Sequence, residues 1–70
     1  MILVTGASGI VGYEIASLFA ANGENVIFQG FKNVSDGFVA IDLTDEGEVC
    51  RLFSKYDITT IIHAAAAIPA

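Results

Sequence analysis

Basic residues are scarce in this 70-residue sequence. Lys32, Arg51 and Lys55 are the only three, against eight acidic residues, and the formal net charge is −5. Without a basic patch the chain lacks the electrostatic attraction that dominates nucleic-acid binding, so we expect no nucleic-acid partner. The single cysteine, Cys50, excludes an internal disulfide, and one cysteine with one histidine does not make a cluster of metal ligands. Cys50 stands among apolar residues, which predicts a small buried thiol.

Long apolar runs are also missing. No stretch approaches the ~20 apolar residues that a membrane-spanning helix needs, and residues 1–4 are too few for the apolar part of a secretion signal. We therefore expect no membrane partner and a location in the reducing cytoplasm. Apolar residues nonetheless make up 54% of the chain and charged residues 16%, which favours a parallel sheet buried on both faces.

The hydrophobic pattern predicts alternating strands and helices. Strands are expected at residues 2–5, 26–29, 38–41 and 59–63, the last continuing toward residue 67. Helices are expected over residues 9–21 and from residue 44 or 45 onward, where Asp45 with Glu48 forms a possible capping box. The apolar stripes expected to face the sheet are Val11, Ile15, Leu18 and Phe19 in the first helix, and Val49, Leu52, Phe53 and Tyr56 in the second.

This order of elements predicts an α/β fold. A helix between two strands makes them parallel, and right-handed crossovers give the strand order 3-2-1-4. That order is the first half of a doubly wound, Rossmann-like sheet, whose ligands bind beyond the carboxyl ends of the strands. No helix follows the fourth strand to cover it. We therefore expect residues 1–70 to be the N-terminal part of a single dinucleotide-binding domain, with the rest of that domain and a substrate domain outside this sequence.

Three glycines at three-residue steps follow the first strand, in the sequence Thr-Gly-Ala-Ser-Gly-Ile-Val-Gly at residues 5–12. Gly6 allows a backbone angle that a side chain penalises, Gly9 leaves room for a pyrophosphate, and Gly12 lets the helix pack tightly on the strand. The first N–H groups of a helix lack intrahelical partners and carry the positive end of its dipole. We therefore expect Gly6, Gly9, Ile10, Val11 and Gly12 to cradle the pyrophosphate. An ordinary strand-to-helix turn is the alternative for a glycine triplet alone.

The end of the second strand is where this kind of fold selects its cofactor. An acidic residue there bonds the ribose hydroxyl of NAD, whereas a basic residue suits the 2′-phosphate of NADP. In register, the acidic position falls on Gly30, and the nearest charged residue is Lys32. This predicts NADP in preference to NAD, with Lys32 facing the adenosine ribose. The alternative is that Lys32 is a solvated loop residue.

The glycine turn resembles the Thr-Gly-x-x-Gly-x-x-Gly turn of the short-chain dehydrogenase/reductase superfamily. It is most similar to the extended branch of nucleotide-sugar epimerases, dehydratases and deoxysugar reductases, such as dTDP-4-dehydrorhamnose reductases. Two later stretches match the same branch, so the resemblance covers nearly all of the chain. It implies an NAD(P)-dependent enzyme that acts on a nucleotide-sugar or a similar carbonyl or alcohol substrate. Members of this branch are commonly homodimers.

The first of these stretches is Asp42-Leu43, after the third strand. The resemblance implies that the Asp42 carboxylate accepts from the exocyclic amine of adenine, while the next backbone N–H donates to a ring nitrogen. A simple turn residue before a helix is the alternative for Asp42.

The second stretch follows the fourth strand, where Ile-Ile-His is followed by Ala64, Ala65 and Ala66. By the same resemblance, these small residues let the cofactor pass over the backbone. We interpret His63 as a packed, hydrogen-bonded scaffold residue, and assign it no acid–base role.

The catalytic residues implied by the resemblance lie outside this sequence. Relatives use a Tyr-x-x-x-Lys pair, and neither Tyr13 nor Tyr56 has a lysine four residues later. We expect residues 1–70 to bind the cofactor and to catalyse nothing alone. The alternatives are a non-catalytic NADP(H)-sensing regulatory subunit of the same fold, and a fragment with no function of its own. Reductase, epimerase and dehydratase are not separated by these residues.

Overall fold

The computed structural model describes residues 1–31 and 34–64. Its elements follow the chain in the order β1 (Ile2–Thr5), α1 (Ile10–Ala21), β2 (Val26–Gly30), β3 (Phe38–Ala40), α2 (Glu46–Lys55) and β4 (Thr60–His63). The four strands form one sheet with the order β3-β2-β1-β4, and every neighbouring pair is parallel. The predicted α/β fold and strand order are therefore confirmed, with β2 one residue longer and β3 one residue shorter than expected. β4 begins one residue later than expected and ends at His63, and residues 65–67 of its predicted continuation lie outside the described residues.

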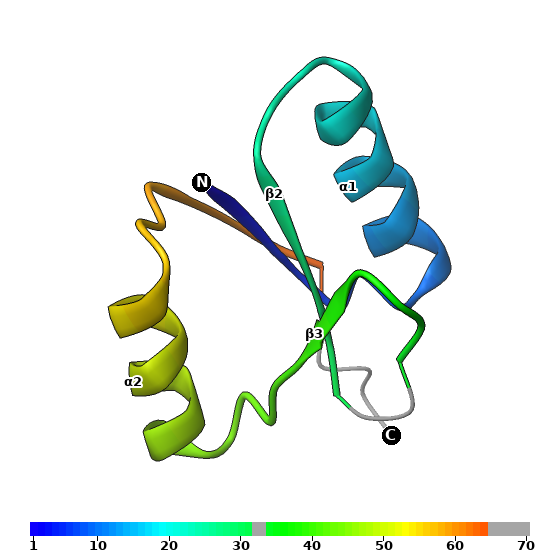
Figure 1. The fold of residues 1–70 in the computed structure, drawn as a ribbon. Helices are drawn as coiled ribbons and strands as arrows, with labels where there is room; N and C mark the ends of the chain where they lie inside the picture. The colour runs from blue at the N-terminus through cyan, green and yellow to red at the C-terminus, as the bar shows by residue number, and fades with distance from the viewer. Residues whose placement is uncertain (32–33, 65–70) are drawn as a thin grey trace.

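The two helices cover opposite faces of the sheet (Figure 1). Side chains alternate along a strand, so neighbouring residues of β1 point to different layers. Leu3 packs with Ile27 and Leu52 on the α2 side. Val4 packs with Ala7 and Ala16 on the α1 side. β1 is an inner strand of the sheet and contributes side chains to the apolar cores on both faces. This explains its almost unbroken apolar sequence.

The face that α1 turns to the sheet differs from the predicted stripe. Gly12 and Ala16 are the buried residues of this helix, whereas Val11 is 65% exposed and Leu18 is 66% exposed. Small residues let the helix backbone approach the sheet, so the contact line follows them instead of the largest apolar side chains. The predicted stripe was wrong for Val11 and Leu18.

α2 follows its predicted pattern more closely, with two corrections. Leu52 is buried and packs on the sheet, while Phe53 remains 44% exposed. Cys50 is exposed, so the expectation of a buried thiol was wrong: position 50 lies on the outer face of the helix, and its apolar neighbours in sequence are not its neighbours in space.

An aromatic cluster fixes the start of α1 against β2 and β3. The Tyr13 ring stacks on Phe38 with centroids 6.2 Å apart, and Phe28 meets Phe38 edge-on at 5.4 Å. Tyr13 thereby closes the side of the sheet next to the glycine turn. Aromatic pairs in such geometries add about 0.5–1.5 kcal/mol to the energy of burial.

Candidate functional site

The turn between β1 and α1 is folded back on itself. Gly6 has φ 67°, in the left-handed region that favours glycine, and its carbonyl accepts a hydrogen bond from Gly9 N at 3.0 Å. A Cβ on Gly12 would overlap the Gly6 carbonyl and lie 3.1 Å from Ala7 Cα. The turn therefore admits no side chain at Gly12, and α1 begins directly against the end of β1.

Gly9 is a different case, because packing within the chain does not require it. Gly9 is exposed, and a Cβ there would meet only Gly6 O at 3.4 Å, an ordinary contact. Its backbone angles, φ −83° and ψ 168°, suit any residue. The missing side chain leaves open the space in front of the helix.

The N-terminus of α1 is left uncapped. Gly9 is its N-cap residue and provides no side-chain hydrogen bond, and the first turn contains no acidic residue. Within residues 1–31 and 34–64, the N–H groups of Ile10, Val11 and Gly12 have no acceptor. These bare donors, with the positive end of the helix dipole, form a site for an anion.

The N-terminus of α2 shows the opposite arrangement. The carboxylate of Asp45 accepts from Gly47 N at 2.9 Å and from Glu48 N at 3.2 Å, and Glu46 adds a second acidic group to the first turn. Only half of the predicted capping box forms, because Glu48 Oε1 accepts from Asp42 N at 3.3 Å instead of from Asp45 N. This chain therefore neutralises one helix N-terminus with its own side chains and leaves the other open.

A cleft of about 310 Å³ joins the glycine turn to the end of β3. It is lined by Gly6, Ser8, Gln29, Phe31, Ile41, Asp42, Leu43 and Thr44. The structure thus brings the predicted adenine pair, Asp42 and Leu43, to the same cleft as Gly6, although 36 positions separate residues 6 and 42 in the sequence.

Asp42 is held as a carboxylate at the edge of this cleft. Its Oδ1 accepts from Thr44 Oγ1 at 2.6 Å and from Thr44 N at 2.9 Å. These two bonds keep the pKa of Asp42 below its usual 3.8, so the group is ionised at neutral pH. The neighbouring N–H of Leu43 donates to no residue that the structure describes. A carboxylate acceptor and a free amide donor therefore stand side by side.

The end of β2 carries Gly30 at the position where NAD-binding folds typically have an acidic residue. A Cβ on Gly30 would overlap Cγ1 of Val34 and lie 3.4 Å from both Cβ and Oγ of Ser8. Lys32, the predicted partner of the adenosine ribose, lies outside the described residues, so its role stays a prediction.

At the other edge, β4 pairs with β1 so that His63 stands opposite Thr5. His63 Nδ1 and Thr5 Oγ1 are 2.7 Å apart, which confirms the hydrogen-bonded interpretation of this histidine, although its side chain is exposed instead of packed. Ala64 N donates to Thr5 O at 3.2 Å, and Ala64 packs against the α1 layer. Ala65 and Ala66 lie outside the described residues.

Sequence reasoning missed five residues that line the cleft, namely Ser8, Gln29, Phe31, Ile41 and Thr44. Gln29 carries a usable signal, because it is a polar residue directly after the apolar run of β2 and is only 2% exposed. Buried polar side chains need hydrogen-bond partners, so such a residue marks a built network.

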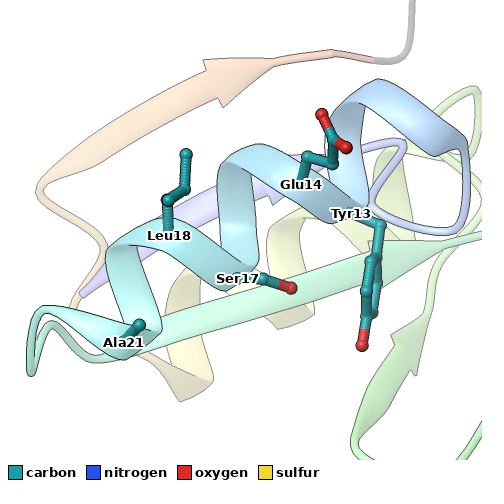
Figure 2. Close-up of a pocket in the computed structure, with 5 residues that line it drawn as sticks. All are labelled: Tyr13, Glu14, Ser17, Leu18 and Ala21. Carbon is teal, nitrogen blue, oxygen red and sulfur yellow. The ribbon is translucent and has the colours of Figure 1, made fainter.

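A larger hollow, of about 530 Å³, lies on the outer face of α1 (Figure 2). Its side chains point in different directions: Tyr13 points to one side of the helix, while Glu14 and Leu18 point to the other. They do not converge on one point, and they lie away from the strand ends. The smaller cleft is therefore the better candidate site.

A comparison with protein-family models identifies the family of this chain. The model of the NAD dependent epimerase/dehydratase family matches residues 2–70. The chain belongs to this family. The predicted resemblance to the short-chain dehydrogenase/reductase superfamily is therefore confirmed, and the family's cofactor is a nicotinamide dinucleotide.

Two curated relatives are both named methionine adenosyltransferase 2 subunit beta. The protein from Xenopus laevis is 33% identical over 64 residues, covering 91% of this chain and 19% of the relative. The protein from Pongo abelii is 29% identical over 65 residues, covering 93% and 20%. This epimerase/dehydratase-family chain therefore spans about a fifth of these relatives. No solved structure matches it.

The described residues fit a nicotinamide dinucleotide. Bare amides at the start of α1 suit a diphosphate, the open space at Gly9 permits its approach, and the donor and acceptor at Leu43 and Asp42 match the edge of adenine. Within the described ranges, no helix has the length and apolar character to cross a membrane. The same residues contain no group of three or more side chains that could hold a metal ion.

Proposed function

We propose that residues 1–70 bind NADP(H), with the diphosphate on the α1 amides and the adenine on Asp42 and Leu43. The observation that carries this proposal is the contrast between the two helices. α2 is capped by Asp45, whereas α1 has no cap, no acidic residue in its first turn and an open Gly9 in front of it. An anion at that position supplies the missing acceptors.

The preference for NADP rests on the end of β2. Position 30 carries a glycine, and any side chain there would have to displace Val34, so position 30 neither accepts from a ribose hydroxyl nor repels a 2′-phosphate. Lys32 supplies the nearest positive charge in the sequence. Titrating the full-length protein with NADPH and NADH tests this. We expect the tighter binding for NADPH, and a clear preference for NADH would refute the assignment.

The adenine assignment is tested separately with Asp42→Ala. The Asp42 carboxylate contributes a charge-assisted hydrogen bond to adenine, and such bonds are worth about 1.5–3 kcal/mol. We therefore expect the variant to lose about tenfold or more in NADPH affinity. A variant that keeps full affinity would return Asp42 to the role of a turn residue before α2.

For the whole protein we propose an oxidoreductase or epimerase that acts on a nucleotide-sugar or a similar carbonyl or alcohol substrate, as a homodimer in the cytoplasm. The bound cofactor supplies hydride chemistry at its nicotinamide ring. The residues described here bind and orient it: the α1 amides hold the diphosphate and Asp42 with Leu43 fixes the adenosine end. The acid–base residues belong to the part of the protein beyond residue 70.

A second candidate is a non-catalytic NADP(H)-binding subunit. Both relatives described above are named as subunit beta of methionine adenosyltransferase 2, and a subunit of this kind is compatible with a binding role without turnover. The full-length sequence separates the two candidates, because the enzyme requires a Tyr-x-x-x-Lys pair after residue 70. NADPH oxidation by the full-length protein with nucleotide-sugar substrates provides the functional test.

A further inference from the structure

The side chain of Gln29 connects three backbone segments beneath the cleft. Its Oε1 accepts from Gly6 N at 2.8 Å, while its Nε2 donates to Gly30 O at 3.0 Å and to Ile41 O at 2.7 Å. The residue is 2% exposed and lines the cleft. One carboxamide thus joins the glycine turn, the end of β2 and the end of β3.

These connections reach both halves of the proposed dinucleotide site. Gly6 belongs to the turn that leads to the α1 amides, and Ile41 directly precedes Asp42 in the chain. The main chain of Gln29 strengthens the first connection, because its carbonyl accepts from Ala7 N at 2.8 Å. The β2–β3 ladder adds another, since Ile41 N donates to Gly30 O at 2.8 Å.

We propose that Gln29 is a positioning residue whose carboxamide sets the spacing between the diphosphate-binding amides of α1 and the adenine-binding pair Asp42 and Leu43. This inference rests on the proposed function. A ligand that spans two half-sites gains affinity only when their separation matches its own length. The amide of Gln29 is rigid and uses both of its ends, so it holds that separation before the ligand arrives.

Gln29 is also an unexpected choice for a purely structural residue. Its position lies in the same strand as Ile27, which fills the α2 layer with apolar surface alone. Burying an amide demands that every donor and acceptor be satisfied, whereas an apolar side chain has no such requirement. The hydrogen bonds of Gln29 are directional and fix the distances between the segments they join, which apolar packing does not do.

The test compares a whole ligand with its two halves. In the full-length protein, Gln29→Met retains the length and bulk of the side chain and removes its hydrogen bonds. We measure the dissociation constants of NADP⁺, adenosine and inorganic pyrophosphate by calorimetric titration, at a temperature where the variant is folded by circular dichroism. We expect NADP⁺ affinity to fall about tenfold or more, and each half to change less than about threefold, because only the whole ligand depends on the spacing.

Ile27→Val is the matched control, since it trims a buried residue of β2 without touching the carboxamide. Its three affinities should equal those of the unaltered protein. If Gln29→Met does not fold, Gln29→Glu replaces it, because it keeps an acceptor for Gly6 N and loses the donor to Gly30 and Ile41. The same pattern of affinities is expected.

Two results would overturn the inference: an equal loss for all three ligands, which indicates a general effect on the fold, and an unchanged NADP⁺ affinity. If the unaltered protein binds none of the three, the proposed function fails and this inference falls with it. If it binds all three and Gln29→Met follows either of the first two patterns, only the inference fails.

Discussion

Replacing Gly9 with aspartate should raise the stability of this protein while removing its affinity for the cofactor. Gly9 is the N-cap residue of α1, and its extended backbone accepts any side chain. α2 provides the template within the same chain, because Asp45 at its N-cap accepts from the amides two and three residues later. In Gly9→Asp, the corresponding donors are Val11 N and Gly12 N, which have no acceptor among the described residues.

The size of each effect follows from those amides. A good N-cap residue gains a few tenths of a kcal/mol over glycine, about 0.3, and a negative charge at a helix N-terminus adds about 0.3–1 kcal/mol. The free energy of unfolding should therefore rise by about 0.6–1.3 kcal/mol. A bound diphosphate loses two charge-assisted hydrogen bonds, each worth about 1.5–3 kcal/mol. At 1.4 kcal/mol for each factor of ten, affinity should fall about a hundredfold or more.

Two measurements on the full-length protein check this reasoning: urea unfolding for stability and fluorescence titration with NADPH for affinity. Asn25→Asp is the control, because it makes the same change of charge at an exposed position between α1 and β2, and it should retain NADPH affinity. The reasoning is refuted if Gly9→Asp binds NADPH within threefold of the unaltered protein. A loss of both stability and affinity would instead indicate that aspartate distorts the turn.

Three further predictions concern single residues. Gly12→Ala should lower the free energy of unfolding by about 1–3 kcal/mol, because the new Cβ overlaps the backbone of Gly6; stability equal to that of the unaltered protein in urea would show that the turn relaxes. Asp45→Ala should lower the free energy of unfolding by about 1 kcal/mol, because α2 loses its N-cap, and it should leave the affinity for NADPH unchanged in a titration. Hydrogen bonds from Thr44 lower the pKa of Asp42 below 3.8 in the folded protein. The Asp42 carboxylate therefore contributes its full stabilisation above pH 3.8, and this contribution is lost as the pH falls through the pKa of the folded state. The stability difference between Asp42→Ala and the unaltered protein, measured in urea, should therefore be constant above about pH 5 and shrink only in stronger acid.

The sequence predicted the sheet well because parallel strands carry their information locally. Buried strands read as apolar runs, and a helix between two of them fixes their direction. The start of α2 at Asp45 was readable for the same reason, since an N-cap is a local feature. The backbone conformation of the glycine turn was also readable, because Gly6 and Gly12 occupy positions that disfavour a side chain. Gly6 has a positive φ, and a Cβ on Gly12 would overlap the Gly6 carbonyl.

The contact face of α1 was not readable, because it depends on the distance between helix and sheet. Val11 and Leu18 have the right spacing and the right chemistry, yet the tight approach at Gly12 rotates them outward. The burial of Cys50 was misjudged for a different reason, because its neighbours in sequence were taken as its neighbours in space. Gln29 was missed because its three partners come from segments that meet only in the folded chain.

The positions that depart from local rules lie together, and this is itself an argument for the site. By local rules, an uncapped helix is less favourable than a capped one. A buried amide in a strand is likewise less favourable than a buried apolar side chain. α2 has its cap at Asp45 and β2 has its apolar residue at Ile27, so the chain is capable of both. The two departures, Gly9 and Gln29, instead flank the turn after β1, where the open amides and the cleft also lie. Natural chains tend to break local rules where function demands it, and the dinucleotide proposed above would account for both of these departures.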